Sequence, residues 1–160
     1  MEHLILCTTN SPTMEEINAL VKGISDDAYE KKGLGPIKSF GIFYKDHQGK
    51  IWAGCSGIVL FQCMYIDNLW VDKSLRNKRI GVKLMKIAEE HALQHGCTMI
   101  TLITMNWEVP KFYQKLGYEI EFIRVGLEKG TMVYFLKKTV TPKKKRIISI
   151  DPPPDVHKTT

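Results

Sequence analysis

One strand–helix–strand pattern in the middle of the chain constrains its fold more than any other feature. Residues 64–71 (MYIDNLWV) form a largely apolar run typical of a buried strand. Residues 80–95 carry apolar side chains at helical spacing and are followed by Gly96, a residue that commonly ends helices. Residues 99–104 form a second apolar run, as strands buried by parallel pairing do. This order predicts two parallel strands joined by a right-handed crossover.

The sequence on either side of this unit predicts further strands and helices. Ser11 and Pro12 are typical of a helix start, as N-cap and first helical residue, and the turn sequence at residues 45–49 favours a hairpin. Gly54 and Gly57 in the next strand indicate a bulge or a close backbone approach. The other expected strands are residues 4–8, 37–44, 51–61, 119–125 and 131–138, and the other expected helices begin at residues 12, 26 and 109.

Length and composition suit one soluble domain with a short tail. The chain has 160 residues, a common size for one domain with its own core, and no apolar run reaches the roughly 18 residues of a membrane span. Its four cysteines include no Cys-x-x-Cys pair, which favours reduced thiols in the cytoplasm over disulfides or a metal site. Residues 139–160 are basic and contain three consecutive prolines, which predicts a flexible tail after a domain of residues 1–138.

The start of the central helix carries an unusual run of positive charge. Six basic residues and no acidic residue lie between Asp72 and Glu89. Cations are unfavourable at a helix N-terminus, which already carries positive partial charge, unless an anion such as a phosphate binds the free amide groups. The alternative is a solvent-exposed basic face without a ligand.

Two motifs resemble the GCN5-related N-acetyltransferase (GNAT) family. Residues 76–81, RNKRIG, resemble its acyl-CoA-binding signature Arg/Gln-x-x-Gly-x-Gly/Ala, with Arg79 at the central glycine position. Residues 106–118, NWEVPKFYQKLGY, resemble its segment Asn-x-x-Ala-x-x-Phe-Tyr-x-x-Leu-Gly-Phe, with Val109 at the alanine position. The resemblance covers residues 4–138. It implies an α/β (α+β) GNAT-type acyl-CoA N-acyltransferase fold, whose central mixed, mostly antiparallel sheet has about six or seven strands and about four flanking helices.

The resemblance also implies a site for acetyl-CoA. Where the family's strand kinks, the amides of Leu69 and Val71 would bind the acetyl oxygen and the pantetheine. An oriented hydrogen-bond donor of this kind contributes about 10²–10³ in rate. The alternative is that these residues form a plain core strand. The pyrophosphate would lie on the amides of residues 77–82. Asn106 would bind CoA or cap the next helix. The predicted donor-binding residues are Leu69, Trp70, Val71, Arg76, Asn77, Lys78, Arg79, Ile80, Gly81, Val82, Asn106 and Tyr113.

Tyr113 and Asp67 are the predicted catalytic residues. Tyr113 takes the family position of the acid that protonates the CoA thiolate, and a phenol with an ordinary pKa near 10 is protonated at neutral pH. The alternative is an aromatic side chain packed on the sheet. Asp67 is the predicted general base and Glu108 the second candidate, although a carboxylate in this role needs its pKa raised by burial. A buried structural carboxylate is the alternative for Asp67.

The implied activity is the transfer of an acetyl group to a primary amine by direct attack on the thioester. A non-catalytic acyl-CoA-binding or sensing module is the alternative, which the departure at Arg79 leaves open. The acceptor, a small-molecule or a protein amine, cannot be read from the sequence, and a homodimer is an option because dimers are common in the family. No metal or membrane partner is expected. Nucleic acid is disfavoured, because the aromatic residues are not interleaved with basic ones as in single-strand binders.

Overall fold

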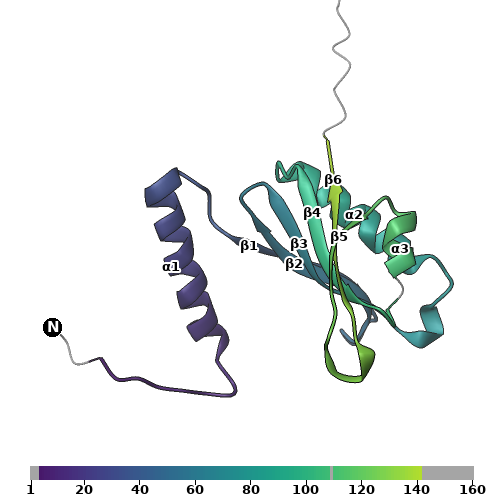
Figure 1. Cartoon of the computed structure of the whole chain (residues 1–160), viewed down its shortest axis with the longest axis horizontal. Coiled ribbons are helices and arrows are strands. Elements are labelled where there is room, and N and C mark those ends of the chain that lie inside the picture. Colours follow the sequence, from purple (N-terminus) through teal and green to yellow (C-terminus); the bar gives the residue numbers. More distant parts are fainter. Residues whose placement is uncertain (1–3, 109, 142–160) are drawn as a thin grey trace, which may run out of the picture.

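The chain forms a mixed six-stranded sheet with the strand order β1-β2-β3-β4-β6-β5 (Figure 1). The computed structural model describes residues 4–108 and 110–141. The strands are β1 (Lys38–Lys45), β2 (Ile51–Leu60), β3 (Cys63–Val71), β4 (Met99–Met105), β5 (Glu119–Arg124) and β6 (Val133–Thr139), the α-helices are α1 (Met14–Lys32), α2 (Ile80–Gln94) and α3 (Pro110–Lys115), and short 3-10 turns lie at Lys73–Leu75 and Glu128–Gly130. The predicted mixed, mostly antiparallel sheet is confirmed, with three α-helices in the described residues instead of about four. The predicted tail of residues 139–160 lies outside the described residues from residue 142 onward.

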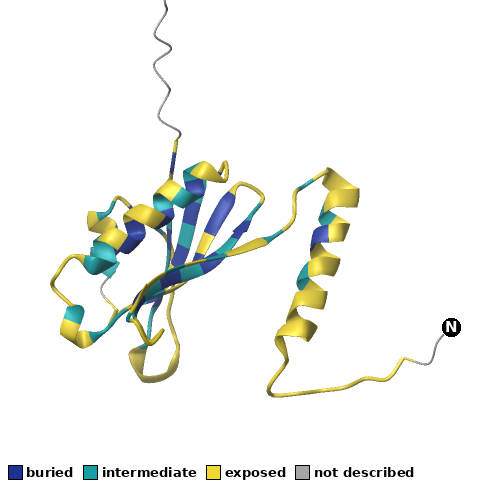
Figure 2. Ribbon diagram, turned by 180° about the vertical axis from the view of Figure 1, so that it is seen from behind, coloured by how far each residue is buried: buried dark blue, intermediate teal, exposed yellow. Residues whose placement is uncertain are grey.

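The core lies between one face of the sheet and helices α2 and α3 (Figure 2). Leu84, Met85 and Ala88 of α2 are buried in the same cluster as Met64 of β3 and Ile100 of β4. The helix presents one apolar stripe because its apolar residues recur every three or four positions, and each strand presents alternate residues to it. This packing fixes the start of α2 beside the ends of the two central strands.

β3 and β4 are parallel neighbours along only part of their lengths. Their register joins residues 63–66 to residues 99–102, as the predicted strand–helix–strand unit requires. Both strands continue beyond these pairs, to residues 71 and 105, without pairing to each other. One edge of the last part of β3, residues 67–71, therefore has no β4 partner among the described residues.

A β-bulge in β3 lies at the point where this pairing ends. Gly57 of β2 faces Ile66 and its neighbour Ser56 faces Asn68, which leaves Asp67 as the extra residue. Glycine is required opposite the bulge, because a Cβ atom on Gly57 would lie 1.9 Å from the carbonyl oxygen of Tyr65. The bulge that the sequence indicated is thus confirmed at Gly57.

Helix α1 is formed by local interactions and stands away from the sheet (Figure 1). Its N-cap is Thr13, whose side chain accepts the N–H of Glu16, while the Glu16 carboxylate accepts the N–H of Thr13. At its other end Gly33 adopts a left-handed conformation with φ 66°. The apolar stripe of α1, which includes Leu20 and Ile24, is exposed. Local capping, more than packing on the sheet, accounts for this helix.

Three predictions for the N-terminal region are wrong. Residues 4–8 form no strand, and their large apolar side chains are exposed. The helix begins after Thr13 instead of Ser11, because the capping box satisfies two amide groups at that position. The expected break before Asp26 is absent: Met14–Lys32 is a single helix, in which Lys22 and Asp26 form an ion pair one turn apart.

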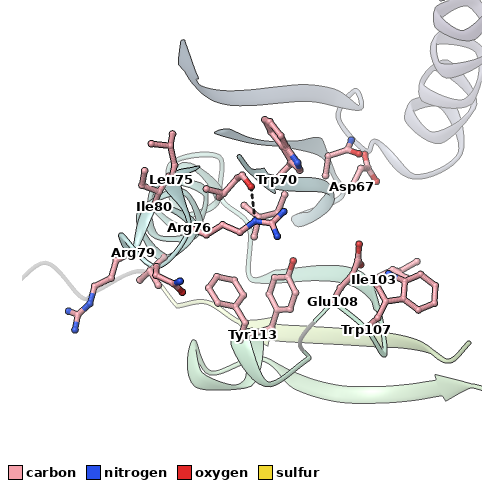
Figure 3. A pocket seen from close by; sticks show the side chains of 17 residues that line it. Asp67, Trp70, Leu75, Arg76, Arg79, Ile80, Ile103, Trp107, Glu108 and Tyr113 are labelled. Carbon is pink, nitrogen blue, oxygen red and sulfur yellow. Dashed lines mark hydrogen bonds between the residues drawn. The ribbon is translucent and has the colours of Figure 1, made fainter. Parts of the chain in front are cut away.

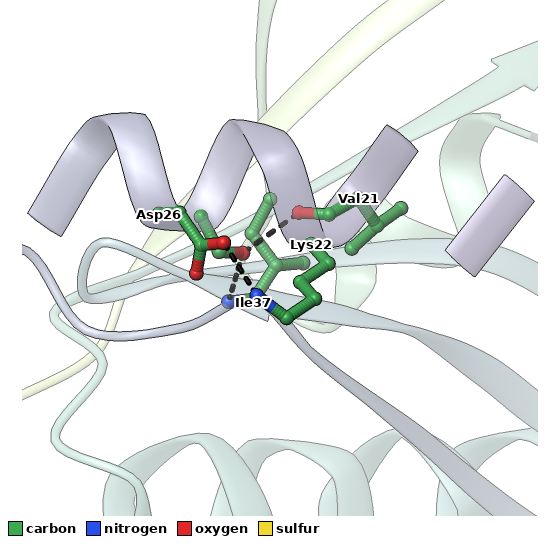
Figure 4. Close-up of polar contacts among 5 residues, drawn as sticks. Val21, Lys22, Asp26 and Ile37 are labelled. Carbon is green, nitrogen blue, oxygen red and sulfur yellow. Dashed lines mark hydrogen bonds and ion pairs between the residues drawn. The ribbon is translucent and has the colours of Figure 1, made fainter. Parts of the chain in front are cut away.

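One buried hydroxyl links α1 to the start of the sheet (Figure 4). The Oγ atom of Ser25 donates to the carbonyl oxygen of Val21 at 2.9 Å and accepts the N–H of Ile37 at 3.3 Å. Ile37 directly precedes β1, so this bond holds the chain before the first strand against the middle of α1.

Candidate active site

A cleft of about 920 Å³ opens where β3 and β4 diverge (Figure 3). Its walls come from the end of β3, the loop before α2, the first turn of α2, the end of β4 and helix α3. The residues that line it are Asp67, Asn68, Leu69, Trp70, Val71, Leu75, Arg76, Asn77, Arg79, Ile80, Gly81, Val82, Ile103, Trp107, Glu108, Phe112 and Tyr113. Two sequence motifs far apart in the chain therefore meet at one cavity.

The loop before α2 has the backbone geometry of an anion site. Asn77 and Arg79 both adopt left-handed conformations, with φ 62° and φ 59°. Arg79 is the N-cap of α2 but its side chain makes no capping hydrogen bond, and Figure 3 shows that side chain directed away from the other lining residues. The first amide groups of α2 are thus left without a side-chain cap, as suits a bound phosphate. The left-handed turn also explains why the related signature has glycine where this chain has Arg79.

Arg76 and Gly81 shape the same end of the cleft. The Nε atom of Arg76 donates to the carbonyl oxygen of Val71 at 3.1 Å, which joins the loop to the last residue of β3 (Figure 3). A Cβ atom on Gly81 would lie 3.3 Å from the ring of Phe112. Gly81 therefore lets the start of α2 approach α3 closely.

Tyr113 brings a protonated phenol to the cleft. Its side chain is almost fully buried, and its ring makes an edge contact with Phe112 at a centroid distance of 5.0 Å. Burial raises the pKa of Tyr113 to about 12, with smaller contributions from the negative charge of Glu108 and from Cys55. The hydroxyl is consequently a proton donor at neutral pH. The sequence left open whether Tyr113 packs in the core or faces the cavity, and the structure has it doing both.

Asp67 and Glu108 are the two carboxylates of the cleft. Burial raises the pKa of Asp67, the extra residue of the bulge. Glu108 lies in the turn after β4, where its Oε2 atom accepts from the hydroxyl of Thr104 at 3.2 Å and from the N–H of Met105 at 3.3 Å. Both predicted candidates for a general base thus face the same cavity, and the carboxylate of Glu108 is held in place by the turn.

Two predicted site residues do not line the cleft. Lys78 is absent from its wall. Asn106 instead binds a distant loop, where its Oδ1 atom accepts the N–H of Met132 at 3.2 Å and its amide donates to the carbonyl oxygen of Gly130 at 3.4 Å. It does not cap α3, which begins at Pro110. A role for Lys78 or Asn106 in donor binding remains a prediction.

Several lining residues were not found by sequence reasoning. Ile103 and Trp107 reach the cavity because β4 leaves β3 before its end, and this divergence has no sequence pattern. Trp107 lies inside the second motif, but its position there is not specified by the family pattern. Its ring is exposed, which only the structure shows, so no sequence signal pointed to it.

The described residues provide neither a cysteine nucleophile at the cleft nor a cluster of metal-binding side chains. No cysteine lines the cleft, and burial raises the pKa of the nearby Cys55 thiol to about 12. Among residues 4–108 and 110–141, no group of three or more His, Cys, Asp and Glu side chains is arranged to hold a metal ion. Within the same residues no helix is both long and apolar enough to cross a membrane.

The sheet and its cleft have the arrangement of an acyl-CoA N-acyltransferase, with parallel strands that diverge beside an uncapped helix N-terminus. A family model described as "Acetyltransferase (GNAT) family" matches residues 15–118. The chain therefore belongs to the GNAT family of acetyltransferases.

Individual relatives agree with this assignment. Blasticidin-S acetyltransferase of Streptomyces morookaense is 30% identical over 86 residues, which are 53% of this chain and 63% of that protein. The crystal structure of an acetyltransferase from Bacillus cereus superposes with a TM-score of 0.67 at 26% identity, over 84% of this chain and 98% of that chain. An aminoglycoside 6'-N-acetyltransferase crystallised with coenzyme A has the same fold, with a TM-score of 0.56 at 19% identity over 66% of this chain and 74% of that chain. The chain thus spans somewhat less than two thirds of the curated relative from Streptomyces.

Proposed function

We propose that this chain transfers the acetyl group of acetyl-CoA to a primary amine by direct attack of the amine on the thioester. The observation that carries the proposal is the cleft itself. It combines an uncapped helix N-terminus in a basic loop, an unpaired strand edge and a protonated tyrosine. Family membership and a relative crystallised with coenzyme A support the same donor.

The residues at the α2 end of the cleft fit the phosphate groups of CoA. Arg76 and Arg79 are the basic residues of its wall, and the amides of residues 80–82 begin the helix. A helix N-terminus with free amides and nearby guanidinium groups binds phosphate well. The unpaired edge of residues 67–71 offers backbone groups to the pantetheine amides and to the acetyl oxygen, which would be polarised by such a hydrogen bond.

The transfer step needs three proton movements at this site. The nitrogen of the neutral amine bonds to the thioester carbonyl carbon, and the carbon–sulfur bond breaks to release a thiolate. Asp67, whose pKa burial raises, accepts the proton that the ammonium group must lose. The phenol of Tyr113 donates its proton to the departing sulfur, and the resulting phenolate takes the second proton that the nitrogen loses as the amide forms. The cleft offers no cysteine as a nucleophile, which favours direct transfer of the acetyl group to the amine over an acyl-cysteine intermediate.

Calorimetry and a thiol-release assay test this proposal. CoA should bind at low ionic strength, and its affinity should fall as salt rises, because exposed charges on the loop are screened. The assay should find an amine that releases thiol from acetyl-CoA. Binding of CoA without release over a broad panel of amines would favour the alternative, a non-catalytic CoA-binding module.

Tyr113→Phe tests the assigned proton donor. The change keeps the buried ring and removes only the hydroxyl, so turnover should fall by about 10²–10⁴ while CoA affinity stays within a few-fold. Tyr44→Phe removes a hydroxyl from a half-exposed tyrosine outside this cleft and should change neither quantity. Unchanged turnover in Tyr113→Phe, with chemistry rate-limiting, would assign the proton to water or to another group.

A further inference from the structure

The cleft has opposite charge at its two ends. Its basic lining residues, Arg76 and Arg79, both come from the loop before α2. Its acidic lining residues, Asp67 and Glu108, come from the bulge in β3 and the turn after β4. Figure 3 shows the labelled Arg79 on one side of the cavity, Asp67 and Glu108 on the other, and Arg76 between them. An anionic donor and a cationic acceptor would therefore enter different ends.

The cleft also presents two large aromatic rings. Trp107 is 64% exposed and Trp70 is 49% exposed, and both line the cleft. Indole rings attract cations over their faces, and they are the strongest of the natural aromatic side chains in this respect. Carboxylates beside exposed indoles are a combination suited to ammonium and guanidinium groups.

The carboxylate of Glu108 is fixed in position before any acceptor arrives. Thr104, itself buried, and the N–H of Met105 both bind its Oε2 atom. Its Oε1 atom has no hydrogen-bond partner among the residues that the structure describes. Neither Glu108 nor Asp67 forms an ion pair in that part of the chain. A second carboxylate beyond the proposed base is thus available to an acceptor.

Glu108 also lies close to the proposed reaction centre. Its negative charge is the second cause, after burial, of the raised pKa of Tyr113. A positive charge bound to Glu108 would sit near the phenol that protonates the leaving sulfur. The distance between a reacting amine and a second cation in the same acceptor must then be short.

We propose that the acceptor is a small amine with at least two positive charges, and that Glu108 and Trp107 bind the charge that does not react. Asp67 takes the proton of the reacting amine, whereas Glu108 and Trp107 select for the second ammonium or guanidinium group. This inference rests on the proposed acetyltransferase function. It assigns Glu108 to specificity and leaves the role of base to Asp67.

Steady-state kinetics with a matched pair of amines tests the inference. 1,4-Diaminobutane and n-butylamine have the same carbon chain and differ in the second charge. The diamine should have a kcat/KM at least ten-fold higher. Glu108→Gln should remove most of this preference, so that the ratio of kcat/KM for the diamine to kcat/KM for butylamine falls about ten-fold. Trp107→Leu should reduce the preference about two- to five-fold, the range of an exposed cation–π contact. Glu90→Gln, which removes one negative charge outside the cleft, is the control.

Binding without turnover gives an independent readout. Titration of the protein with 1,4-diaminobutane, with and without CoA, should change the tryptophan fluorescence, and Glu108→Gln should weaken this binding about ten-fold. Equal kcat/KM for diamine and monoamine in the native protein would overturn the inference while leaving acetyl transfer intact. A ten-fold loss for both amines in Glu108→Gln would also overturn it, because Glu108 would then act on the reacting amine. Absence of CoA binding would instead overturn the proposed function, and the inference with it.

Discussion

Replacing Gly57 by alanine should damage the site through the backbone alone. The new Cβ atom would lie 1.9 Å from the carbonyl oxygen of Tyr65, whereas ordinary contacts of such atoms begin at 3.4 Å. β2 and β3 must therefore separate by about 3.4 − 1.9 = 1.5 Å at this point, and no side-chain rotation can relieve the clash. The bulge at Asp67, which faces the cleft, lies directly opposite.

Gly57→Ala should lower both the stability of the protein and its turnover. Overpacking typically destabilises by about 1–3 kcal/mol, which for a chain of this size lowers Tm by about 2–12 °C. A misplacement of about 1 Å at the reacting groups costs about 10² in rate, so turnover should fall beyond what the stability loss explains. Calorimetric melting and thiol release at a temperature where both proteins are folded measure the two effects.

Gly41→Ala is the matched control for this substitution. Gly41 lies in the neighbouring strand β1, and its new Cβ atom would meet only the half-exposed ring of Phe43, which can rotate. Its effect on turnover should be small. If Gly57→Ala melts and turns over like Gly41→Ala, the bulge can shift without harm, and the argument that glycine is required opposite it is wrong.

Two further substitutions test the backbone and the charges of the cleft. Arg79→Gly should raise the free energy of unfolding by about 1 kcal/mol, because a left-handed conformation costs a residue with a side chain about 1–2 kcal/mol; an unchanged or lower Tm would show that the turn is not strained. Asp67→Asn should be more stable than the native protein at pH 7. Folding raises the pKa of the native carboxyl, so the native protein loses folding stability as pH rises from the pKa of this group in the unfolded state to its pKa in the folded state. That gain should vanish below about pH 4, where the carboxyl is protonated in both states, and a gain independent of pH would mean that burial of the charge is not its cause.

The central strand–helix–strand unit and half of the cleft could be predicted, because short stretches of sequence determine them. An amphipathic helix between two apolar runs permits few arrangements, and the glycine at position 57 indicated the bulge before any geometry was known. The two motifs supplied the loop before α2 and Tyr113. Trp107 and Ile103 could not be found in this way, since they reach the cavity only because two paired strands separate part-way along.

The N-terminal region shows why patterns fail where several local signals compete. Ser11 followed by Pro12 is a good helix start, but Thr13 with Glu16 satisfies two backbone groups at once and is therefore the N-cap. Periodicity correctly predicted a helix with an apolar stripe. It could not indicate that the stripe would be exposed. The pattern shows that one face of the helix is apolar, but not whether another element covers that face. The same limit applies to residues 4–8, whose apolar run alone does not make a strand.

The extra residue in β3 has a consequence for the two faces of that strand. Before the bulge, even-numbered residues such as Met64 and Ile66 point into the core, and after it odd-numbered residues such as Leu69 and Val71 do so. With the same residues but no bulge, strict alternation from Ile66 would turn Asn68 and Trp70 inward in place of Leu69 and Val71. The side chain at position 67 can therefore vary with the chemistry of the site, whereas a chain that has a residue at this position needs the bulge for the strand to have an apolar inner face.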